Sequence, residues 1–303
     1  MILRTFLKAL MAGALFAGVV GPAMAAGAGA TSMRYVERGH GAHAVIFIHG
    51  FGQSADYWTP WMQLLGDCGV HAIAFDLPGF GRSADAPGPY TIPALAETIA
   101  QFMQARGLSS ATLVGGAMGS TVAQYVALNH PDLTERLVLI ATASRSTYPA
   151  PRTREAQLAS WRTSATIDGF FFAKKPPKAY AGLFYEAFDR MNRDAGVEAD
   201  TSNQNWSTYE RLGEITAPTL IIQGAEDHGK SPAEGARMVE KMHDARLVVL
   251  ENASHTPQWD QPAAFTDAAL PFILASQPEE RARRCLAHYD AKTFRALGDI
   301  GTP

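Results

Sequence analysis

Two stretches of the sequence hold side chains that could transfer a proton, and a third has the glycines that usually surround a nucleophile. Asp227 ends the stretch Gln-Gly-Ala-Glu-Asp, and His255 lies in Asn-Ala-Ser-His-Thr-Pro. A carboxylate that accepts a hydrogen bond from histidine Nδ1 fixes the ring tautomer and leaves Nε2 to take a proton. The third stretch, residues 115–119 (Gly-Gly-Ala-Met-Gly), fits the pattern G-x-S-x-G except for the serine. Ala117 therefore stands where this pattern places a nucleophile.

An apolar run precedes each of these stretches, which predicts that each follows a strand. The predicted strands are residues 33–38, 44–48, 70–75, 111–114, 136–141, 219–222 and 246–250, and the predicted helices are 54–65, 92–106, 118–129, 232–242 and 262–274. Strands that alternate with helices indicate a parallel sheet. Loops at the carboxyl ends of parallel strands converge on one crevice. We therefore expect the glycine-rich turn, Asp227 and His255 to meet there.

Residues 144–212 interrupt this alternation. Their apolar spacing is helical but irregular, and the segment is rich in aromatic side chains. A connection of this length is uncommon within a compact domain, so we predict a helical subdomain. The core is then formed by residues 26–143 and 213–275, and the charged tail, residues 276–303, could form a last helix.

The N-terminus predicts export from the cytoplasm. Arg4 and Lys8 precede an apolar run, which is followed by Gly21-Pro22 and the small-residue pattern Ala23-Met-Ala25. The alternative is a membrane anchor, but the run is shorter than the ~20 residues needed to span a bilayer. We predict a signal peptide over residues 1–25, cleavage after Ala25, no stable membrane anchor afterwards, and a periplasmic or secreted protein.

The bulk composition argues against several classes of partner. The net charge is −3 with no basic run, so we expect no nucleic-acid partner. The nine histidines and two cysteines show no metal-ligand spacing, so we predict neither a metal nor a cofactor. An oxidising compartment would allow Cys68 and Cys285 to pair, and the alternative is two separate buried thiols.

Over nearly the whole mature length, the sequence resembles the α/β-hydrolase fold family. The matching stretches are His49-Gly-Phe-Gly52, Asp76-Leu-Pro-Gly-Phe-Gly-Arg-Ser83, residues 115–119, Gly224-Ala-Glu-Asp227, Ser254-His-Thr-Pro257 and Gln261-Pro262. The resemblance implies an α/β fold with a mostly parallel central sheet, helices on both faces, and a helical cap over residues 144–212. A cap must cover the crevice, so its aromatic side chains favour an apolar or aromatic substrate, with Phe171, Phe172 and Tyr185 as candidate contacts.

The resemblance also implies a role for each site residue. His255 would be the general base and Asp227 would orient it, with Glu226 as the alternative acid. The backbone amides of Phe51 and Met118 would form an oxyanion hole. Ser120 lies about one helical turn beyond Ala117, so we do not expect it to replace the missing nucleophile.

Two functions remain open at this point. The first is a secreted hydrolase, monomeric or weakly oligomeric, acting on an ester, lactone or related acyl bond, here made nearly inactive by a Ser-to-Ala replacement. The second is a natural non-hydrolytic member, either a ligand-binding protein or a lyase or oxygenase that uses His255 as base.

The resemblance further implies that Cys68 ends the first helix and Cys285 follows the last, on one face of the sheet, where they can form a disulfide.

Overall fold

A single mixed sheet forms the centre of the molecule. The computed structural model describes residues 33–41, 43–146, 152–161, 172–173 and 178–294. In these ranges seven strands are hydrogen-bonded in the order β1-β3-β2-β4-β5-β6-β7. Their bounds are β1 Arg34–Arg38, β2 Ala44–Ile48, β3 His71–Asp76, β4 Ala111–Gly116, β5 Thr134–Ile140, β6 Thr219–Gly224 and β7 Ala245–Leu250. β1 runs antiparallel to β3, and the other pairings are parallel.

The central strands are apolar throughout because both faces of the sheet are covered. Every residue of β2, β3, β4 and β6 is buried, as expected for a parallel sheet between two layers of helices. The parallel register brings the carboxyl ends of six strands, β2 to β7, to one edge. At that edge the paired residues are Ile48 with Gly115, Gly116 with Ile140, Ile140 with Ile222, and Gly224 with Leu250.

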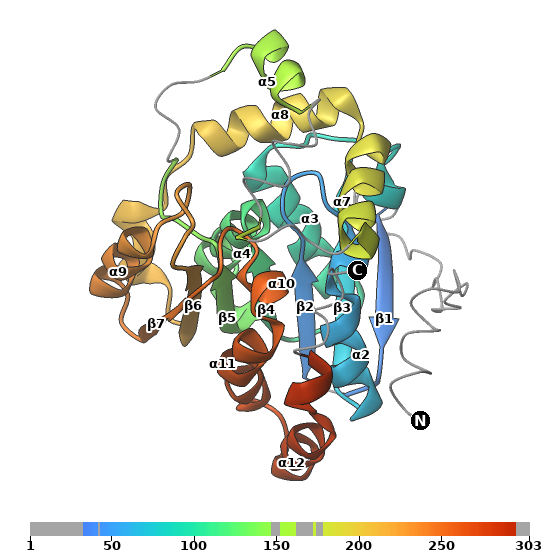
Figure 1. The fold of residues 1–303 in the computed structure, drawn as a ribbon, viewed down its shortest axis with the longest axis vertical. Coiled ribbons are helices and arrows are strands. Elements are labelled where there is room, and N and C mark those ends of the chain that lie inside the picture. The colour runs from blue at the N-terminus through green and yellow to red at the C-terminus, as the bar shows by residue number, and fades with distance from the viewer. Residues whose placement is uncertain (1–32, 42, 147–151, 162–171, 174–177, 295–303) are drawn as a thin grey trace.

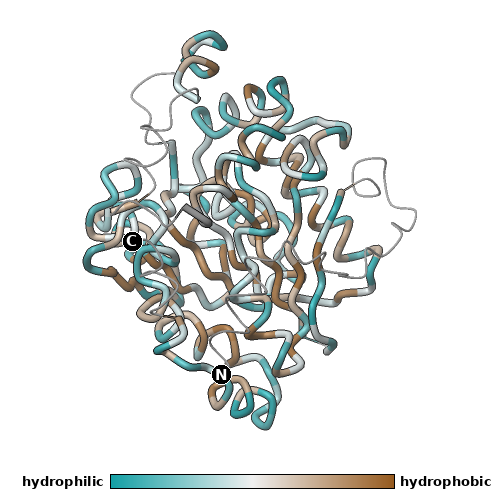
Figure 2. Tube along the Cα trace, turned by 45° about the vertical axis from the view of Figure 1, so that its right-hand side comes forward, coloured by the Kyte–Doolittle hydropathy of each residue, from teal (hydrophilic) through white to brown (hydrophobic). Residues whose placement is uncertain are grey.

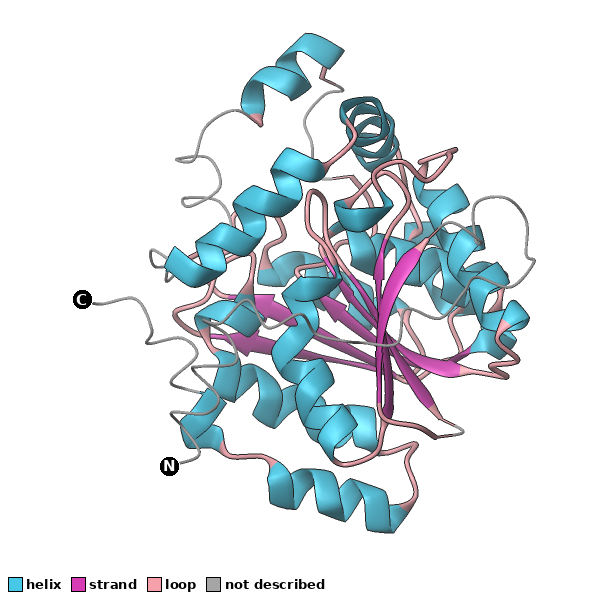
Figure 3. Cartoon of the chain, turned by 90° about the vertical axis from the view of Figure 1, so that its right-hand side faces the viewer, coloured by secondary structure: helices cyan, strands magenta, loops and turns pink. Residues whose placement is uncertain are grey.

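Helices cover both faces of this sheet (Figures 1 and 3), which confirms the predicted fold class. The core helices are α2 Thr59–Asp67, α3 Ile92–Ala105, α4 Met118–Asn129, α9 Pro232–Lys241, α10 Pro257–Asp260, α11 Pro262–Leu274 and α12 Glu279–His288. α3 and α4 pack together on one face, and α2 and α11 lie on the other, where Trp61 Nε1 donates to Thr266 Oγ1 at 3.0 Å. In Figure 2 the hydrophobic colour gathers on the central strands, whereas the outer helices alternate between hydrophilic and hydrophobic residues. None of the helices in the described ranges has the length and apolar character to cross a bilayer.

Residues 144–212, which we term the insert, leave the sheet after β5 and return before β6. Its described helices are α5 Arg154–Ser160, α7 Lys178–Arg190 and α8 Arg193–Gln204. α5 and α8 lie beyond the carboxyl ends of the strands, at the top of Figure 1. Two backbone amides of the core, at Tyr90 and Ile92, donate to Glu198 and Ser202 of α8 and hold this helix in place. Residues 1–25, predicted to be a signal peptide, lie outside the described residues.

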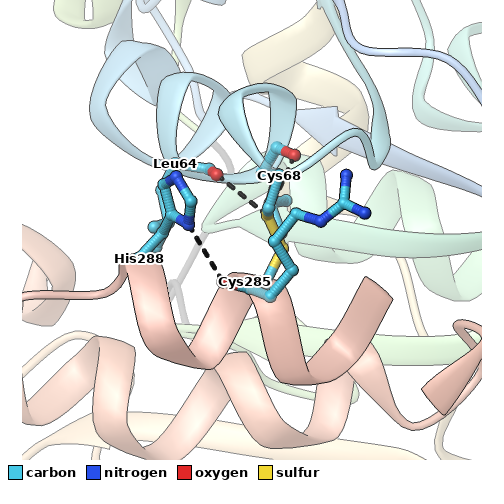
Figure 4. Close-up of a disulfide and its surroundings, with 6 residues drawn as sticks. Leu64, Cys68, Cys285 and His288 are labelled. Atoms are coloured by element: carbon cyan, nitrogen blue, oxygen red, sulfur yellow. Dashed lines mark hydrogen bonds between the residues drawn. A yellow bond between two sulfur atoms is a disulfide. The ribbon is translucent and has the colours of Figure 1, made fainter. Parts of the chain in front are cut away.

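A disulfide between Cys68 and Cys285 joins two helices beneath the core (Figure 4). Cys68 caps the carboxyl end of α2. Cys285 lies within α12 rather than after the last helix, because the charged tail forms one more helix than the core pattern requires. Both cysteines are fully buried, and their Cα atoms are 5.1 Å apart.

Removing this disulfide should destabilise the fold. The bridge closes a loop with a sequence separation of 217, and replacing both cysteines by alanine should lower the free energy of unfolding by ~3–5 kcal/mol. Urea unfolding with and without dithiothreitol measures the difference, and the double alanine variant should not respond to the reductant. Two reactive thiols in the denatured, unreduced protein would show that the bridge does not form.

Candidate active site

The glycine-rich turn between β4 and α4 holds Ala117 in a strained conformation. Ala117 has φ 49° and ψ −115°, a region that residues with a Cβ rarely occupy. A Cβ on Gly119 would lie 2.3 Å from the carbonyl oxygen of Ile48, and one on Gly115 would lie 2.4 Å from the carbonyl oxygen of Gly119. The two glycines therefore allow α4 to start directly against β2 and β4. Ala117 is partly exposed while its neighbours on both sides are buried, so the turn presents this one position at the sheet edge.

His255 and Asp227 form a buried hydrogen-bonded pair. His255 Nδ1 lies 2.7 Å from Asp227 Oδ2, and Asp227 Oδ1 accepts the backbone amides of Gly229 and Lys230 at 2.8 Å each. Burial alone would raise the pKa of the Asp227 carboxyl, but the charge and hydrogen bond of His255 and the two amides lower it below its ordinary value. An ionised carboxylate only accepts hydrogen bonds, so Nδ1 carries the proton of the neutral ring. Nε2 is then the nitrogen that can act as a base.

Close backbone contact brings the acid and histidine loops together. A Cβ on Gly224 would lie 2.2 Å from the carbonyl oxygen of Ser254, and the amide of Glu226 donates to the carbonyl oxygen of Ala253 at 2.9 Å. This contact leaves the Glu226 side chain exposed. Of the two acids considered from sequence, Asp227 is the one that the structure pairs with His255.

The loop after β2 lies against the turn that holds Ala117. A Cβ built on Gly50 would lie 3.3 Å from the Cβ of Ala117 and 3.2 Å from the carbonyl oxygen of Gly116. His49 fixes this loop: its Nε2 accepts the amide of Leu77 at 3.0 Å, so its Nδ1 donates to the carbonyl oxygen of Gly50 at 2.7 Å. Burial lowers the pKa of His49, in agreement with a neutral ring.

Two backbone amides at this contact have no acceptor in the described part of the chain. The amide of Met118 is the first of α4, and helix amides in the first turn have no partner within the helix. The amide of Phe51 follows Gly50 in the loop, and neither amide donates to another described residue. This arrangement can stabilise an oxyanion formed next to position 117.

Ser120 is buried and engaged in two hydrogen bonds. Its Oγ lies 2.6 Å from the carbonyl oxygen of Ala117 and 2.8 Å from Thr142 Oγ1. The hydroxyl therefore secures the first turn of α4 to the end of β5. This position agrees with the expectation that Ser120 does not replace a nucleophile at 117.

A second polar network holds the Pro-Gly loop after β3. Asp76 is fully buried and accepts hydrogen bonds from the amides of Ala55 and Arg82 and from Arg82 Nε. Both side chains therefore support the loops behind the site.

The aromatic side chains beside the site come from both the core and the insert. Phe172 packs on Phe184 with ring centroids 5.2 Å apart, and Phe184 packs on Tyr57 of the core at 5.3 Å. Tyr185 is partly buried against the core, and Phe171 lies outside the described residues. The ring of Phe51, whose amide was considered above, is surrounded by three others at 5.0–5.9 Å, those of Phe80, Trp161 and Phe188.

The sequence analysis did not identify two glutamine side chains that contact the loop after β2 and the turn that holds Ala117. Gln53 accepts the amide of Gly50 at 2.8 Å, and Gln258 Nε2 donates to Tyr57 Oη. A Cβ on Gly116 would lie 3.8 Å from that same Nε2. The position of Gln53 directly after His49-Gly-Phe-Gly52 was the available signal. In the described ranges, no group of three or more His, Cys, Asp or Glu side chains is arranged to hold a metal ion.

Comparisons with known proteins identify the family of this chain. The model of the alpha/beta hydrolase family matches residues 45–268. The 2-hydroxy-6-oxononadienedioate/2-hydroxy-6-oxononatrienedioate hydrolase of a Pseudomonas species is 25% identical over 259 residues, which cover 80% of this chain and 92% of the relative. The 2-hydroxy-6-oxo-6-phenylhexa-2,4-dienoate hydrolase of Comamonas testosteroni is 26% identical over 264 residues, with 80% and 91% covered.

A solved structure gives the same result at the level of the fold. The crystal structure of a hydrolase from Pseudomonas aeruginosa PA01 superposes with a TM-score of 0.71 and 26% identity, covering 80% of this chain and 94% of that one. The family model spans the strained turn, the acid loop and the histidine loop alike. The chain therefore belongs to the α/β-hydrolase family.

Proposed function

We propose that this chain is built to hydrolyse an ester, lactone or related acyl bond of a small molecule, and that Ala117 takes the place of the serine nucleophile. The observation that carries the proposal is the 2.7 Å hydrogen bond from His255 to Asp227 at the sheet edge that also holds the strained turn. A serine at 117 would attack the carbonyl carbon as His255 Nε2 takes its proton. The amides of Phe51 and Met118 would stabilise the oxyanion until the alcohol leaves with the proton that His255 Nε2 returns. A water molecule that gives its proton to the same nitrogen would then attack the acyl-serine, release the acid and restore the hydroxyl.

An apolar or aromatic substrate fits the surroundings of this site. The ring of Phe51 packs on Trp161 and Phe188 of the insert. One relative is named for a substrate with a phenyl group.

The proposal includes export, supported by the N-terminal sequence pattern and by a disulfide that suits an oxidising compartment.

Covalent labelling tests the proposal. The variant Ala117→Ser should react with a fluorophosphonate, because an activated serine attacks the phosphorus and displaces fluoride. Peptide mass spectrometry should place the adduct on residue 117, whereas the chain with alanine should remain unlabelled. The assignment would be contradicted if the alanine chain and Ala117→Ser were labelled to the same extent. Equally fast labelling of Ala117→Ser/His255→Ala would contradict it as well.

A second candidate function starts from Ala117 itself, because a methyl group cannot form an acyl-enzyme. In this alternative, His255 of the unaltered chain removes a proton from a bound ligand, as in a lyase or oxygenase, or the chain only binds the ligand. Proton exchange or cleavage catalysed by the alanine form and abolished by His255→Ala would favour the alternative. Inertness of Ala117→Ser toward esters and fluorophosphonates would favour it equally.

A further inference from the structure

The loop after β6 carries a buried cation that the catalytic scheme does not use. Lys230 is 9% exposed, and its backbone amide donates to Asp227 Oδ1 at 2.8 Å. Lys230 therefore lies in the same loop as Asp227, the acid that is hydrogen-bonded to His255. Its Nζ forms no hydrogen bond or ion pair with any residue in the described part of the chain.

Trp206 of the insert faces this cation. Lys230 Nζ lies 5.8 Å from the centre of the Trp206 ring. The carbonyl oxygen of Trp206 accepts the amide of Ser146 at 3.0 Å, so Trp206 lies where the two ends of the insert meet above the sheet. The indole Nε1 is also buried and has no acceptor among the described residues. Two buried donors thus lie together without a hydrogen-bond acceptor in the described ranges.

The neighbouring carboxylates do not supply that acceptor. Asp227 acts on Lys230 through its charge, but its oxygens are occupied by His255 and by the amides of Gly229 and Lys230. Glu234 also acts through its charge: its Oε1 is paired with Arg237, and its buried Oε2, which has no hydrogen-bond partner among the described residues, forms no ion pair with Lys230. Both carboxylates favour the charged amine from a distance.

An ammonium group in this position is costly unless it is paired. Burial lowers the pKa of Lys230 from 10.5 to about 8, against the opposing effects of Asp227 and Glu234. The face of an aromatic ring compensates only part of the lost hydration of a cation. An apolar side chain would fill the same space at lower cost, so the lysine is explained best by a ligand that supplies the missing acceptor.

We propose that Lys230 and Trp206 Nε1 bind a carboxylate group of the substrate, which narrows the substrate class to apolar or aromatic acyl compounds that carry a carboxylate. This inference rests on the proposed function for the place of the ligand beside His255 and Asp227. Lys230 is then a specificity-determining residue. It selects the substrate and takes no part in the proton transfers.

Binding to the unaltered chain tests the proposal without any catalysis. The probes are 4-phenylbutyrate and its neutral amide, 4-phenylbutyramide, measured by calorimetry or thermal shift. The acid should bind about 10 to 100-fold more tightly than the amide, as expected for a charge-assisted hydrogen bond. Lys230→Met should remove that preference while changing binding of the amide less than about threefold. The exposed Lys241, replaced by methionine, is the matched control and should leave the preference intact.

Folding is monitored in the same experiment. Lys230→Met removes a buried charge, so its melting temperature should equal or exceed that of the parent, which separates a lost contact from a lost fold. Equal binding of acid and amide by the parent, or failure of the acid to bind at about 10 mM, would overturn the proposal. Loss of both ligands together in Lys230→Met would overturn it as well.

A kinetic arm distinguishes this inference from the proposed function. In the Ala117→Ser background, the ratio of kcat/KM for 4-nitrophenyl hydrogen glutarate to that for 4-nitrophenyl pentanoate should fall at least about tenfold on Lys230→Met. If Ala117→Ser is inert but the acid is still preferred in binding, the hydrolase proposal fails and the carboxylate site stands. If both esters are hydrolysed and Lys230→Met leaves their ratio unchanged, the carboxylate site fails alone.

Discussion

Replacing Ala117 by serine should raise kcat for hydrolysis of 4-nitrophenyl butyrate by about 10⁴ to 10⁶-fold over the chain with alanine. His255 is hydrogen-bonded to Asp227, and the loop after Gly50 lies against Ala117; the proposed function uses this pair and the amides of Phe51 and Met118 around position 117. On the proposed function, a single oxygen atom at residue 117 is what the chain lacks. Initial rates near neutral pH, with both proteins at equal concentration, measure the gain.

The matched control is Ala117→Gly, which changes the same position without adding a nucleophile. It should hydrolyse the ester no faster than the alanine form. A folded Ala117→Ser protein that shows no gain over Ala117→Gly would remove the hydrolase proposal and leave the non-hydrolytic alternative.

The second large effect concerns the acid. In the Ala117→Ser background, Asp227→Asn should lower kcat by about 10⁴-fold, because an amide can donate to Nδ1 and stabilise the wrong tautomer of His255. The low pKa of Asp227 means that the carboxylate is ionised throughout the neutral range, so the loss should be similar across that range. Rates measured with saturating 4-nitrophenyl butyrate give kcat directly.

The adjacent acid provides the control for this prediction. Glu226 is exposed and precedes Asp227 in the same loop, so Glu226→Gln removes a charge from that loop without removing the partner of His255. It should change kcat by less than about threefold, as expected for an exposed charge in high dielectric. A larger loss from Glu226→Gln than from Asp227→Asn would reverse the assignment of the orienting acid.

The backbone conformation of Ala117 is unusual for a residue that has a Cβ. An alanine at φ 49° stores about 1–3 kcal/mol of backbone strain. Glycine would relieve that strain, and a turn without a chemical duty has no need of a Cβ. The strained backbone at Ala117 therefore agrees with the proposal that this position is built to hold a nucleophilic side chain.

Most of the architecture could be predicted from the sequence because the hydrophobic periodicity is strong. Five helix and seven strand predictions overlap the described elements. For these twelve predictions, the errors lie in the residues at which a strand or helix begins or ends. β4 continues through Gly115 and Gly116, since pairing with β5 holds them in the ladder although glycine is a poor strand former. The helix predicted from Ser54 begins as a 3₁₀ turn at Ala55–Trp58, followed by α2.

The candidate site was only partly predictable, for a different reason. Asp227 and His255 follow strands whose carboxyl ends must meet, so topology alone brings them together. The pairing of Lys230 with Trp206 depends on how the insert returns to the core, and no periodic pattern encodes that contact. Gln258 could not be predicted because an uncharged amide side chain outside any spaced motif gives no signal, whereas the position of Gln53 directly after residues 49–52 was a usable one.

The most direct test of this account is to capture the acyl group on residue 117. The Ala117→Ser variant is mixed with 4-nitrophenyl butyrate, quenched in acid and digested, and the mass of the peptide that contains residue 117 is measured. The account predicts a butyryl group on that residue, which is absent when His255 is also replaced by alanine. A butyryl group on another residue, or turnover of the ester without any acylated peptide containing residue 117, would contradict it.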